Sequence, residues 1–348
     1  MLTARELALS GCQVTLLERQ QTGRESSWAG GGIISPLYPW RYDDAVTALA
    51  GWSQQHYRQL SESLKEETGE DPEWTQNGLL MMQVEDQTEA QNWAAAHRVS
   101  LQILTADDVA ACEPLLGSPS PAVWMKDVAQ IRNPYLAVAL VASLRRLGVN
   151  VVEDMPVLSL LSRDGRVRGV KTAQGEISAG QVILAGGAWS GELMAELKTD
   201  IELQPVKGQM ILFKAKPGWL QRIVLQGDRY LIPRRDGHVL MGSTLEYTQF
   251  DKSTTEVALE ELQQAAFELV PGLKDYPVVK QWAGLRPGTP HGIPYILEHP
   301  GIEGLYLNAG HFRNGVVLGP ASARLMADIV LKRETIIPSD SYKLLAIH

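Results

Sequence analysis

Apolar residues recur at helical spacing over three long segments of the chain. Every third or fourth position is apolar across 43–68, 135–147 and 316–332, which is the pattern of a helix with one face packed on a core. Gly148 follows the second segment, at a place where glycine commonly ends a helix. Shorter helices are predicted over 2–10, over 86–97 with Asp86 as the N-cap, and over 254–269.

Continuous apolar runs mark the predicted strands. The run 13–18 ends in Glu18, and the run 181–185 ends in a pair of glycines, so both are typical of buried strands in a parallel sheet. The segment 149–161 is predicted as one strand that opens a β-meander. The turns of this meander are expected at Asp164-Gly165 and Gln174-Gly175. Further strands are predicted over 78–84, in several runs of 201–245, over 277–282 and over 304–310.

The first elements form half of a nucleotide-binding pattern. A helix, then Gly11 and an apolar strand that ends in Glu18, make the second half of a dinucleotide-binding β-α-β unit. In that unit the acid accepts hydrogen bonds from ribose hydroxyls, although an ordinary surface glutamate would look the same in the sequence. The leading strand and its G-x-G-x-x-G turn do not precede this helix. We therefore expect a truncated start, with two unpaired strand edges and weakened cofactor retention.

Composition narrows the class of protein. With 348 residues, of which 45% are hydrophobic and 21% charged, the chain is long enough for two domains with sizeable cores. A net charge of −8 without basic blocks argues against a nucleic-acid or anionic-membrane partner. Cys12 and Cys112 are the only cysteines, the histidines lack metal-binding spacing, and no apolar run has the length of a membrane span. We expect a cytoplasmic protein without a metal site.

Two arginines lie in segments rich in glycine and proline. Arg286 lies in Trp-Ala-Gly-Leu-Arg-Pro-Gly-Thr-Pro at 282–290, and Arg313 in Ala-Gly-His-Phe-Arg-Asn-Gly at 309–315. A guanidinium presents parallel N–H donors in one plane, which suits a carboxylate. We expect both side chains to be held in tight loops and to face one small carboxylic acid. For either arginine, a structural ion pair with one of the 40 acidic residues is the alternative.

Two further segments are suited to a cofactor. The segment that carries Arg313 leads directly into the helix predicted over 316–332, and a helix N-terminus stabilises negative charge such as that of a reduced flavin. Three consecutive glycines, Gly30 to Gly32, let the backbone approach a ligand closely. Glycine loops without a ligand are equally common, so this second signal is weak alone.

The two arginine motifs closely resemble those of the glycine oxidase family, within the D-amino-acid oxidase superfamily of FAD enzymes. The resemblance spans nearly the whole chain and also includes the segments 16–19, 23–33, 156–158, 205–209 and 230–234. It implies an α/β fold in which an FAD-binding Rossmann-like domain, here without its first strand and glycine loop, is interleaved with an α+β substrate domain that contains a large mixed or antiparallel sheet. The implied FAD-binding domain comprises 1–43, 129–200 and 285–340, and the implied substrate-binding domain comprises 44–128 and 201–284.

The same resemblance implies roles for individual residues. Arg313 is implied to bind the substrate carboxylate, Arg286 to contact the substrate, and Tyr230 to hydrogen-bond the carboxylate; without the resemblance, Tyr230 could equally be a core tyrosine. Glu18 and Arg19 are implied on the adenosine side, with the backbone of Val157 at the adenine. The implied FAD contacts are Glu18, Arg19, Ser26, Ser27, Gly30, Gly31, Gly32, Val157, His311, Phe312, Arg313, Asn314, Gly315, Val316 and Val317.

The implied reaction is the oxidative deamination of glycine, with sarcosine and small D-amino acids as further candidate substrates. The products would be the imine, then glyoxylate and NH3, with O2 reduced to H2O2. Hydride transfer from Cα to the flavin needs no protein base, so we assign no acid or base residue, His311 included. The FAD would be non-covalent, because neither cysteine lies in the C-terminal loops.

The resemblance also implies partners. The imine would pass to a thiazole synthase that makes the thiazole of thiamine, and the chain would form a homo-oligomer, a tetramer in the family. Two alternatives to glycine oxidation stay open. One is a sarcosine or D-amino-acid oxidase or dehydrogenase, and the other is a truncated, non-catalytic flavoprotein-like scaffold.

Overall fold

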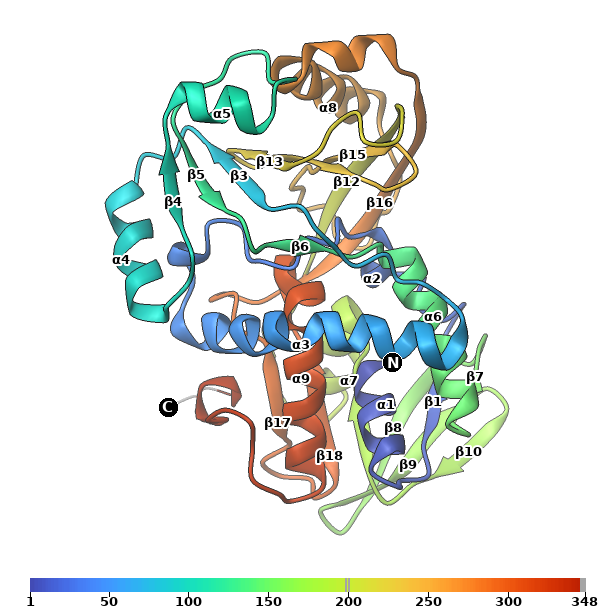
Figure 1. The fold of residues 1–348 in the computed structure, drawn as a ribbon. Helices are drawn as coiled ribbons and strands as arrows, with labels where there is room; N and C mark the ends of the chain where they lie inside the picture. Colours follow the sequence, from blue (N-terminus) through green and yellow to red (C-terminus); the bar gives the residue numbers. More distant parts are fainter. Residues whose placement is uncertain (198, 200, 345–348) are drawn as a thin grey trace.

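The protein is built around one large sheet and a group of smaller sheets, with a long helix between them (Figure 1). The computed structural model describes residues 1–197, 199 and 201–344. The long helix is α3 (Asp44–Thr68). Its first N–H groups are capped by the Asp43 side chain, which accepts a 2.8 Å hydrogen bond from the Ala45 N–H, and it ends at Gly69 in the left-handed conformation.

The large sheet has eight strands, and all neighbouring pairs are antiparallel except β13 with β3. This confirms the large mixed sheet expected from the sequence. The strands lie in the order β16 (Val278–Gly288), β12 (Gln204–Lys214), β15 (His238–Gly242), β14 (Arg229–Pro233), β13 (Ile223–Gln226), β3 (Leu79–Met82), β5 (Ala122–Met125) and β4 (Gln102–Leu104).

The two faces of this sheet are covered differently. On one face α8 (Glu256–Leu269) and the 3-10 turn η3 (Pro271–Asp275) bury Ile211, Phe213 and Leu231. On the other face Met210, Tyr230 and Ile232 pack against the segment that begins at Ile33. Residues 26–32, which end in Gly30, Gly31 and Gly32, are called the glycine segment. Alternation along β14 therefore points Tyr230 and Ile232 towards this segment, and Leu231 towards α8.

The smaller sheets contain the parallel strands expected of a nucleotide-binding fold. β1 (Thr15–Leu17) pairs in parallel with β7 (Asn150–Val152), and β11 (Val182–Leu184) pairs in parallel with β18 (Leu305–Ala309), which also pairs with β17 (Tyr295–Glu298). Across the part of the chain that the structure describes, no strand pairs with the second edge of β1 or of β11.

Helices pack beside these sheets and around α3 (Figure 1). They form one apolar core in which Leu49 and Tyr57 of α3 meet Leu318 and Leu325. The helices that share this core with α3 are α1 (Leu2–Leu9), α6 (Asn133–Arg146) and α9 (Gly315–Val330). The other helices are α2 (Ser26–Ala29), α4 (Gln87–His97), α5 (Ala106–Cys112) and α7 (Ser190–Ala195). The remaining strands are β2 (Thr75–Gln76), β6 (Ala129–Gln130), and the meander β8 (Val157–Arg163), β9 (Arg166–Thr172) and β10 (Gly175–Ser178).

One local expectation from the sequence is wrong, and a second is confirmed only in part. The run 149–161 forms two strands, β7 and β8, because Asp154 has a φ of +55° and Pro156 follows it, so the extended run is interrupted. Asp86 is the N-cap residue of α4, as predicted, but its side chain makes no hydrogen bond to the helix backbone. It instead accepts hydrogen bonds from the Trp40 indole and the Arg41 guanidinium.

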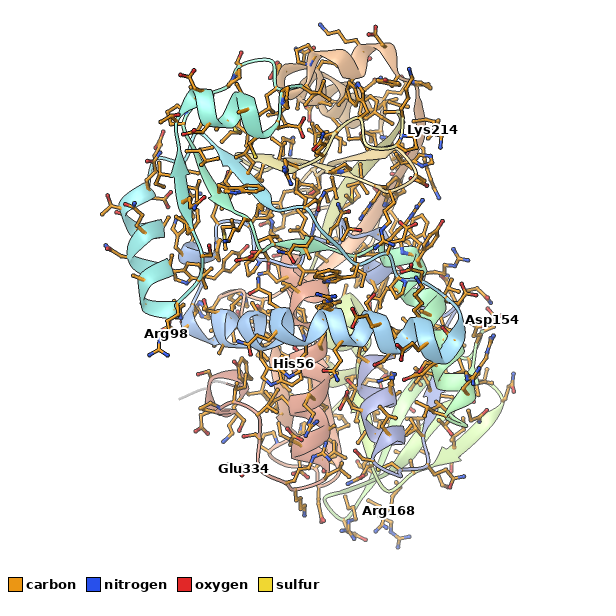
Figure 2. All side chains as sticks on the ribbon, in the orientation of Figure 1. His56, Arg98, Asp154, Arg168, Lys214 and Glu334 are labelled. Carbon is orange, nitrogen blue, oxygen red and sulfur yellow. The ribbon has the colours of Figure 1, made fainter. Side chains whose placement is uncertain are left out.

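Charged side chains are spread over the outside of the molecule. Arg98, Arg168, Lys214 and Glu334 are exposed and project from separate parts of the surface (Figure 2). Among the described residues, no helix combines the length and apolar character that crossing a membrane requires.

Candidate active site

Tyr230 lies where two glycines approach its ring. Its side chain points from β14 towards Gly31, and only 8% of the residue is exposed. A methyl group at Gly31 would lie 3.1 Å from Cε2 of the ring, and one at Gly242 would lie 2.9 Å from the same atom. The absence of side chains at these glycines therefore lets the phenol lie between β15 and the glycine segment.

Arg286 lies inside β16 and not in the loop that the sequence suggested. It pairs with Val206 of β12. Pro287 is compatible with this strand because β16 is the edge of the sheet, where a missing N–H breaks no ladder on the open side. The expectation of a tight loop is wrong because glycine and proline at a sheet edge look like a loop in the sequence.

The Arg286 guanidinium crosses the backbone of Gly208, its diagonal neighbour on β12. It donates a 2.7 Å hydrogen bond from Nη2 to Ser243 Oγ and a 3.3 Å bond from Nη1 to the Thr244 carbonyl. No acid among the described residues forms an ion pair with it. Burial lowers the pKa of Arg286, and interaction with the Tyr230 hydroxyl acts in the opposite direction.

Arg313 lies in the 3-10 turn η4 (Phe312–Asn314), directly before α9. Its Nη2 is 2.9 Å from Oδ1 of Asp228, on the turn between β13 and β14. The Arg313 side chain is 22% exposed, and that of Asp228 is 66% exposed. Burial opposes the charge of Arg313, but the hydrogen bond to Asp228 and the nearby Tyr42 and Tyr230 raise its pKa overall.

The structure thus brings the three sequence-predicted substrate residues together. Arg286 and Arg313 are close enough for each charge to oppose the other, and both interact with Tyr230. We call Arg286, Arg313 and Tyr230 the carboxylate site. The three residues come from β16, from η4 and from β14, so only the folded chain assembles them.

The segment at the start of α9 leaves buried polar atoms without partners. Nε2 of His311 and Nδ2 of Asn314 are buried and have no hydrogen-bond partner among the described residues. The N-cap residue Asn314 does not cap α9 with its side chain. Burial lowers the pKa of His311 to about 4, so the imidazole is neutral near pH 7 and is a weak base. Buried polar atoms of this kind normally meet a ligand or water.

The glycine segment is tied to the strand that carries Arg286. Ser26 donates from its hydroxyl to the Leu285 carbonyl, and Trp282 Nε1 donates a 3.0 Å hydrogen bond to the Ala29 carbonyl. Asn133 Nδ2 donates a 2.8 Å bond to the Ser27 carbonyl. The loop of Gly30, Gly31 and Gly32 therefore leaves α2 at a fixed position beside β16.

The residues predicted on the adenosine side form a second group. The Met155 N–H donates a 2.8 Å hydrogen bond to the Glu18 carbonyl. Glu18 therefore lies beside Met155, which precedes Val157 by two positions in the chain. The Arg19 guanidinium stacks 3.5 Å over the Trp189 ring and pairs with Glu25 at 3.2 Å. The contacts of Arg19 within the protein link the end of β1 to the start of α2.

Sequence reasoning missed several residues that shape the site. Asp228 and Ser243 gave no signal, because each is far in the sequence from the arginine that it contacts. Asp228 is 85 positions from Arg313, and Ser243 is 43 positions from Arg286. Arg234 could have been found, because it follows Tyr230 and Ile232 at strand alternation. Gly208 is in a segment that the resemblance included, but glycine alone does not indicate which side chain crosses it.

Comparison with known proteins identifies the family. A family model described as "FAD dependent oxidoreductase" matches residues 1–329. The chain belongs to this family. A glycine oxidase of Pseudomonas aeruginosa is 53% identical over 344 residues, which are 98% of this chain and 94% of that protein. A "Bifunctional protein ThiO/ThiG" of Trichormus variabilis is 31% identical over 343 residues, 95% of this chain but 51% of that protein.

A solved structure shows the same fold. The crystal structure of glycine oxidase from Geobacillus kaustophilus has a TM-score of 0.94 and 28% identity, and the match covers 99% of this chain and 95% of that one. As a member of the FAD-dependent oxidoreductase family, this chain is an enzyme whose cofactor is FAD. The residues fit that group, because His311 and Asn314 leave buried polar atoms for a ligand at the α9 N-terminus.

Gly208→Ala should move the Arg286 guanidinium with little effect on folding. The new methyl would lie 2.2 Å from Nη2, and the flexible end of the arginine can shift while the backbone stays. We expect the Kd of the flavin-bound protein for acetate, from spectral titration, to rise roughly tenfold as one charge-assisted hydrogen bond is lost. Gly51→Ala is the matched control, because a methyl at Gly51 meets nothing within 4 Å. Equal Kd values for both variants would contradict the assigned geometry.

His311 should make the folded protein sensitive to acid. Below pH 6.5 the unfolded chain takes up a proton on this imidazole, whereas the folded protein excludes it until about pH 4. The free energy of unfolding should therefore fall by about 2 kcal/mol between pH 6.5 and pH 5 from this group. Urea unfolding of wild type and His311→Gln at both pH values measures the difference. The same loss in both proteins would show that another group is responsible.

Proposed function

We propose that this chain catalyses the FAD-dependent oxidative deamination of glycine. Two observations support the proposal. The first is the similarity to proteins named glycine oxidase, including 53% identity to that of Pseudomonas aeruginosa. The second, which carries the argument from the site itself, is a half-buried Arg286 that has no acidic partner among the described residues and lies beside Arg313 and Tyr230.

A guanidinium that is partly withdrawn from water and has no anion beside it carries a desolvation cost, which favours a ligand that supplies the anion. The guanidinium of Arg286 is held from one side by Ser243 and Thr244, and an amino-acid carboxylate would complete its hydrogen bonds. Arg313 has an acidic partner, but Asp228 is largely exposed, so its ion pair with Arg313 is a weak one that a substrate can replace. Tyr230 would donate the third hydrogen bond to the carboxylate.

The protein groups hold the substrate and leave its amine uncharged. FAD, when bound, supplies the two-electron acceptor for the Cα–H bond and passes the electrons to O2, which yields H2O2. The carboxylate site orients the amino acid so that Cα faces the cofactor. His311 is neutral at pH 7, and no proton transfer is assigned to it. The imine product is then hydrolysed by water to glyoxylate and NH3.

The remaining assignments extend this proposal. Residues 1–43, 129–200 and 285–340 would hold FAD, and residues 44–128 and 201–284 would shape the substrate side. The FAD contacts would be those that the resemblance implies, from Glu18 and Arg19 at the adenosine to the 311–317 segment at the flavin. The similarity to a protein named ThiO/ThiG supports transfer of the imine to a thiazole synthase for thiamine. A cytoplasmic homo-oligomer, a tetramer in the family, completes the proposal.

The visible spectrum of the purified protein tests this function. Oxidised flavin absorbs near ~450 nm, and glycine added without oxygen should bleach that band. Sarcosine and D-alanine, tested in parallel, should bleach it more slowly. If sarcosine or D-alanine bleaches the flavin band and glycine does not, the compound that bleaches it is the substrate in place of glycine. A flavin that none of the three reduces would refute an amine oxidase.

Arg313→Ala should raise KM for glycine roughly 100-fold, or by about 3 kcal/mol, because a charge-assisted pair with the carboxylate is lost. Asp228→Asn removes the acidic partner of Arg313 but keeps the guanidinium. If Arg313 binds substrate, this second variant should keep or lower KM, because no carboxylate of the protein competes for the guanidinium. If Arg313 only makes a structural ion pair, both variants will raise KM alike, and steady-state kinetics will separate the two cases.

A further inference from the structure

The glycine segment crosses one face of β14. Tyr230, Ile232 and Arg234 project from this face at alternate positions. A methyl at Gly31 would lie 2.9 Å from Cδ1 of Ile232 and 3.1 Å from the Tyr230 ring. The backbone at Gly31 is therefore packed directly on the strand that presents the Tyr230 hydroxyl.

The Arg234 guanidinium holds the glycine segment by hydrogen bonds to backbone carbonyl groups. Its Nη2 donates a 2.7 Å hydrogen bond to the Gly31 carbonyl, and its Nη1 donates a 3.1 Å bond to the Ile131 carbonyl. The two carbonyls belong to neighbouring extended segments, because the Ile131 N–H donates to the Gly32 carbonyl at 2.8 Å. One guanidinium thus binds both segments, and it is 8% exposed.

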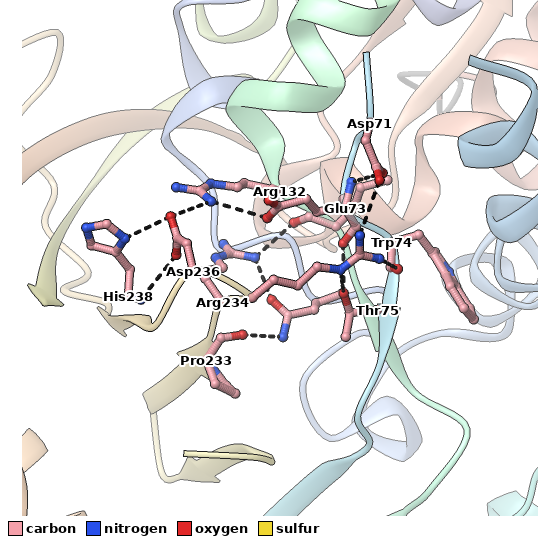
Figure 3. Close-up of polar contacts among 12 residues, drawn as sticks. Asp71, Glu73, Trp74, Thr75, Arg132, Pro233, Arg234, Asp236 and His238 are labelled. Atoms are coloured by element: carbon pink, nitrogen blue, oxygen red, sulfur yellow. Dashed lines mark hydrogen bonds and ion pairs between the residues drawn. The ribbon is translucent and has the colours of Figure 1, made fainter. Parts of the chain in front are cut away.

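The charge of Arg234 is stabilised by amide and carbonyl dipoles, and no acid among the described residues forms an ion pair with it. Gln130 Oε1 accepts a 2.6 Å bond from Nη1, and the Gln130 amide is oriented by donating 2.7 Å to the Pro233 carbonyl. The nearby acids Glu73 and Asp236 instead pair with Arg132, at 3.2 and 2.9 Å (Figure 3).

This arrangement points to a role in positioning. Burial lowers the pKa of Arg234 to about 10, so it remains charged near pH 7. A buried cation without an ion pair is rarely the best choice for stability alone, because an apolar residue of similar volume avoids the cost of desolvation. What the guanidinium provides, and an apolar residue cannot, is directional donors for two backbone carbonyls.

We propose that Arg234 is a positioning residue that fixes the distance between the Gly30–Gly32 loop, which lines FAD, and Tyr230, which contacts the substrate carboxylate. The inference rests on the proposed function in both halves, for the FAD contact of the loop and for the substrate contact of Tyr230. Because the loop and Tyr230 lie on the same face of one strand, loss of the guanidinium frees the loop while the carboxylate site keeps its three side chains.

Arg234→Gln, which keeps a polar side chain but removes the charge and the fork, is the main variant. Apoprotein titrated with FAD should show a Kd raised roughly tenfold or more through the loss of charge-assisted hydrogen bonds. In anaerobic stopped-flow mixing with glycine, the limiting rate of flavin reduction should fall roughly tenfold as alignment is lost. The Kd for glycine should change less than about threefold, because all three groups of the carboxylate site remain.

Arg234→Lys keeps the charge but replaces the planar fork with a single donor nitrogen. Its FAD Kd and reduction rate should therefore lie between those of wild type and Arg234→Gln. Arg235→Gln is the matched control. That neighbouring arginine is exposed and bonds instead to Thr75 and the Trp74 carbonyl, so FAD Kd and reduction rate should equal those of wild type.

Wild-type FAD affinity and reduction rate in Arg234→Gln would overturn the inference, as would a change of the same size in Arg235→Gln. If Arg234→Gln does not fold, the Lys variant decides by the same two measurements. If wild type binds FAD but glycine does not reduce it, the proposed function fails. The comparison of FAD Kd values then still tests whether Arg234 holds the loop.

Discussion

The pairing of β12 with β16 is the interaction on which the site depends. It places Arg286 opposite Val206, and the lack of a side chain at Gly208 allows the guanidinium to cross the neighbouring strand. Two further hydrogen bonds join β16 to the glycine segment. The Leu285 carbonyl accepts from the Ser26 hydroxyl, and the Trp282 indole N–H donates to the Ala29 carbonyl. One ladder at the edge of the large sheet therefore sets the positions of both Arg286 and the start of the glycine segment.

The second constraint is the fixed relation between that segment and β14. Tyr230 and Ile232 pack against the Gly31 backbone, and Arg234 holds its carbonyl. The two strands that flank the site thus act on the glycine segment from different directions. β16 holds it at Ala29, and β14 holds it at Gly31. A loop anchored at both points has little freedom to change its distance from the phenol.

The sequence was sufficient for much of the fold because the long helices have strong periodicity. The segment predicted at 43–68 is α3 (Asp44–Thr68), and that at 316–332 is α9 (Gly315–Val330). It failed at Arg286, since glycine and proline mark a loop and an edge strand alike. The resemblance named Arg286, Arg313 and Tyr230, and the fold brings them together. Their supports, Asp228 and Ser243, could not be predicted, because contacts between distant segments leave no local pattern.

The convergence of two guanidinium groups has a consequence for the substrate as well as for its binding. The protein as a whole is acidic, with a net charge of −8, but Arg286 and Arg313 make this one site cationic. Positive charges close to an ammonium group lower its pKa. An amino acid held between the two arginines would therefore release its ammonium proton more readily than in water. The lone pair of the amine must be free for the Cα–H bond to be oxidised, and it would be freed by the same two residues that are proposed to hold the carboxylate.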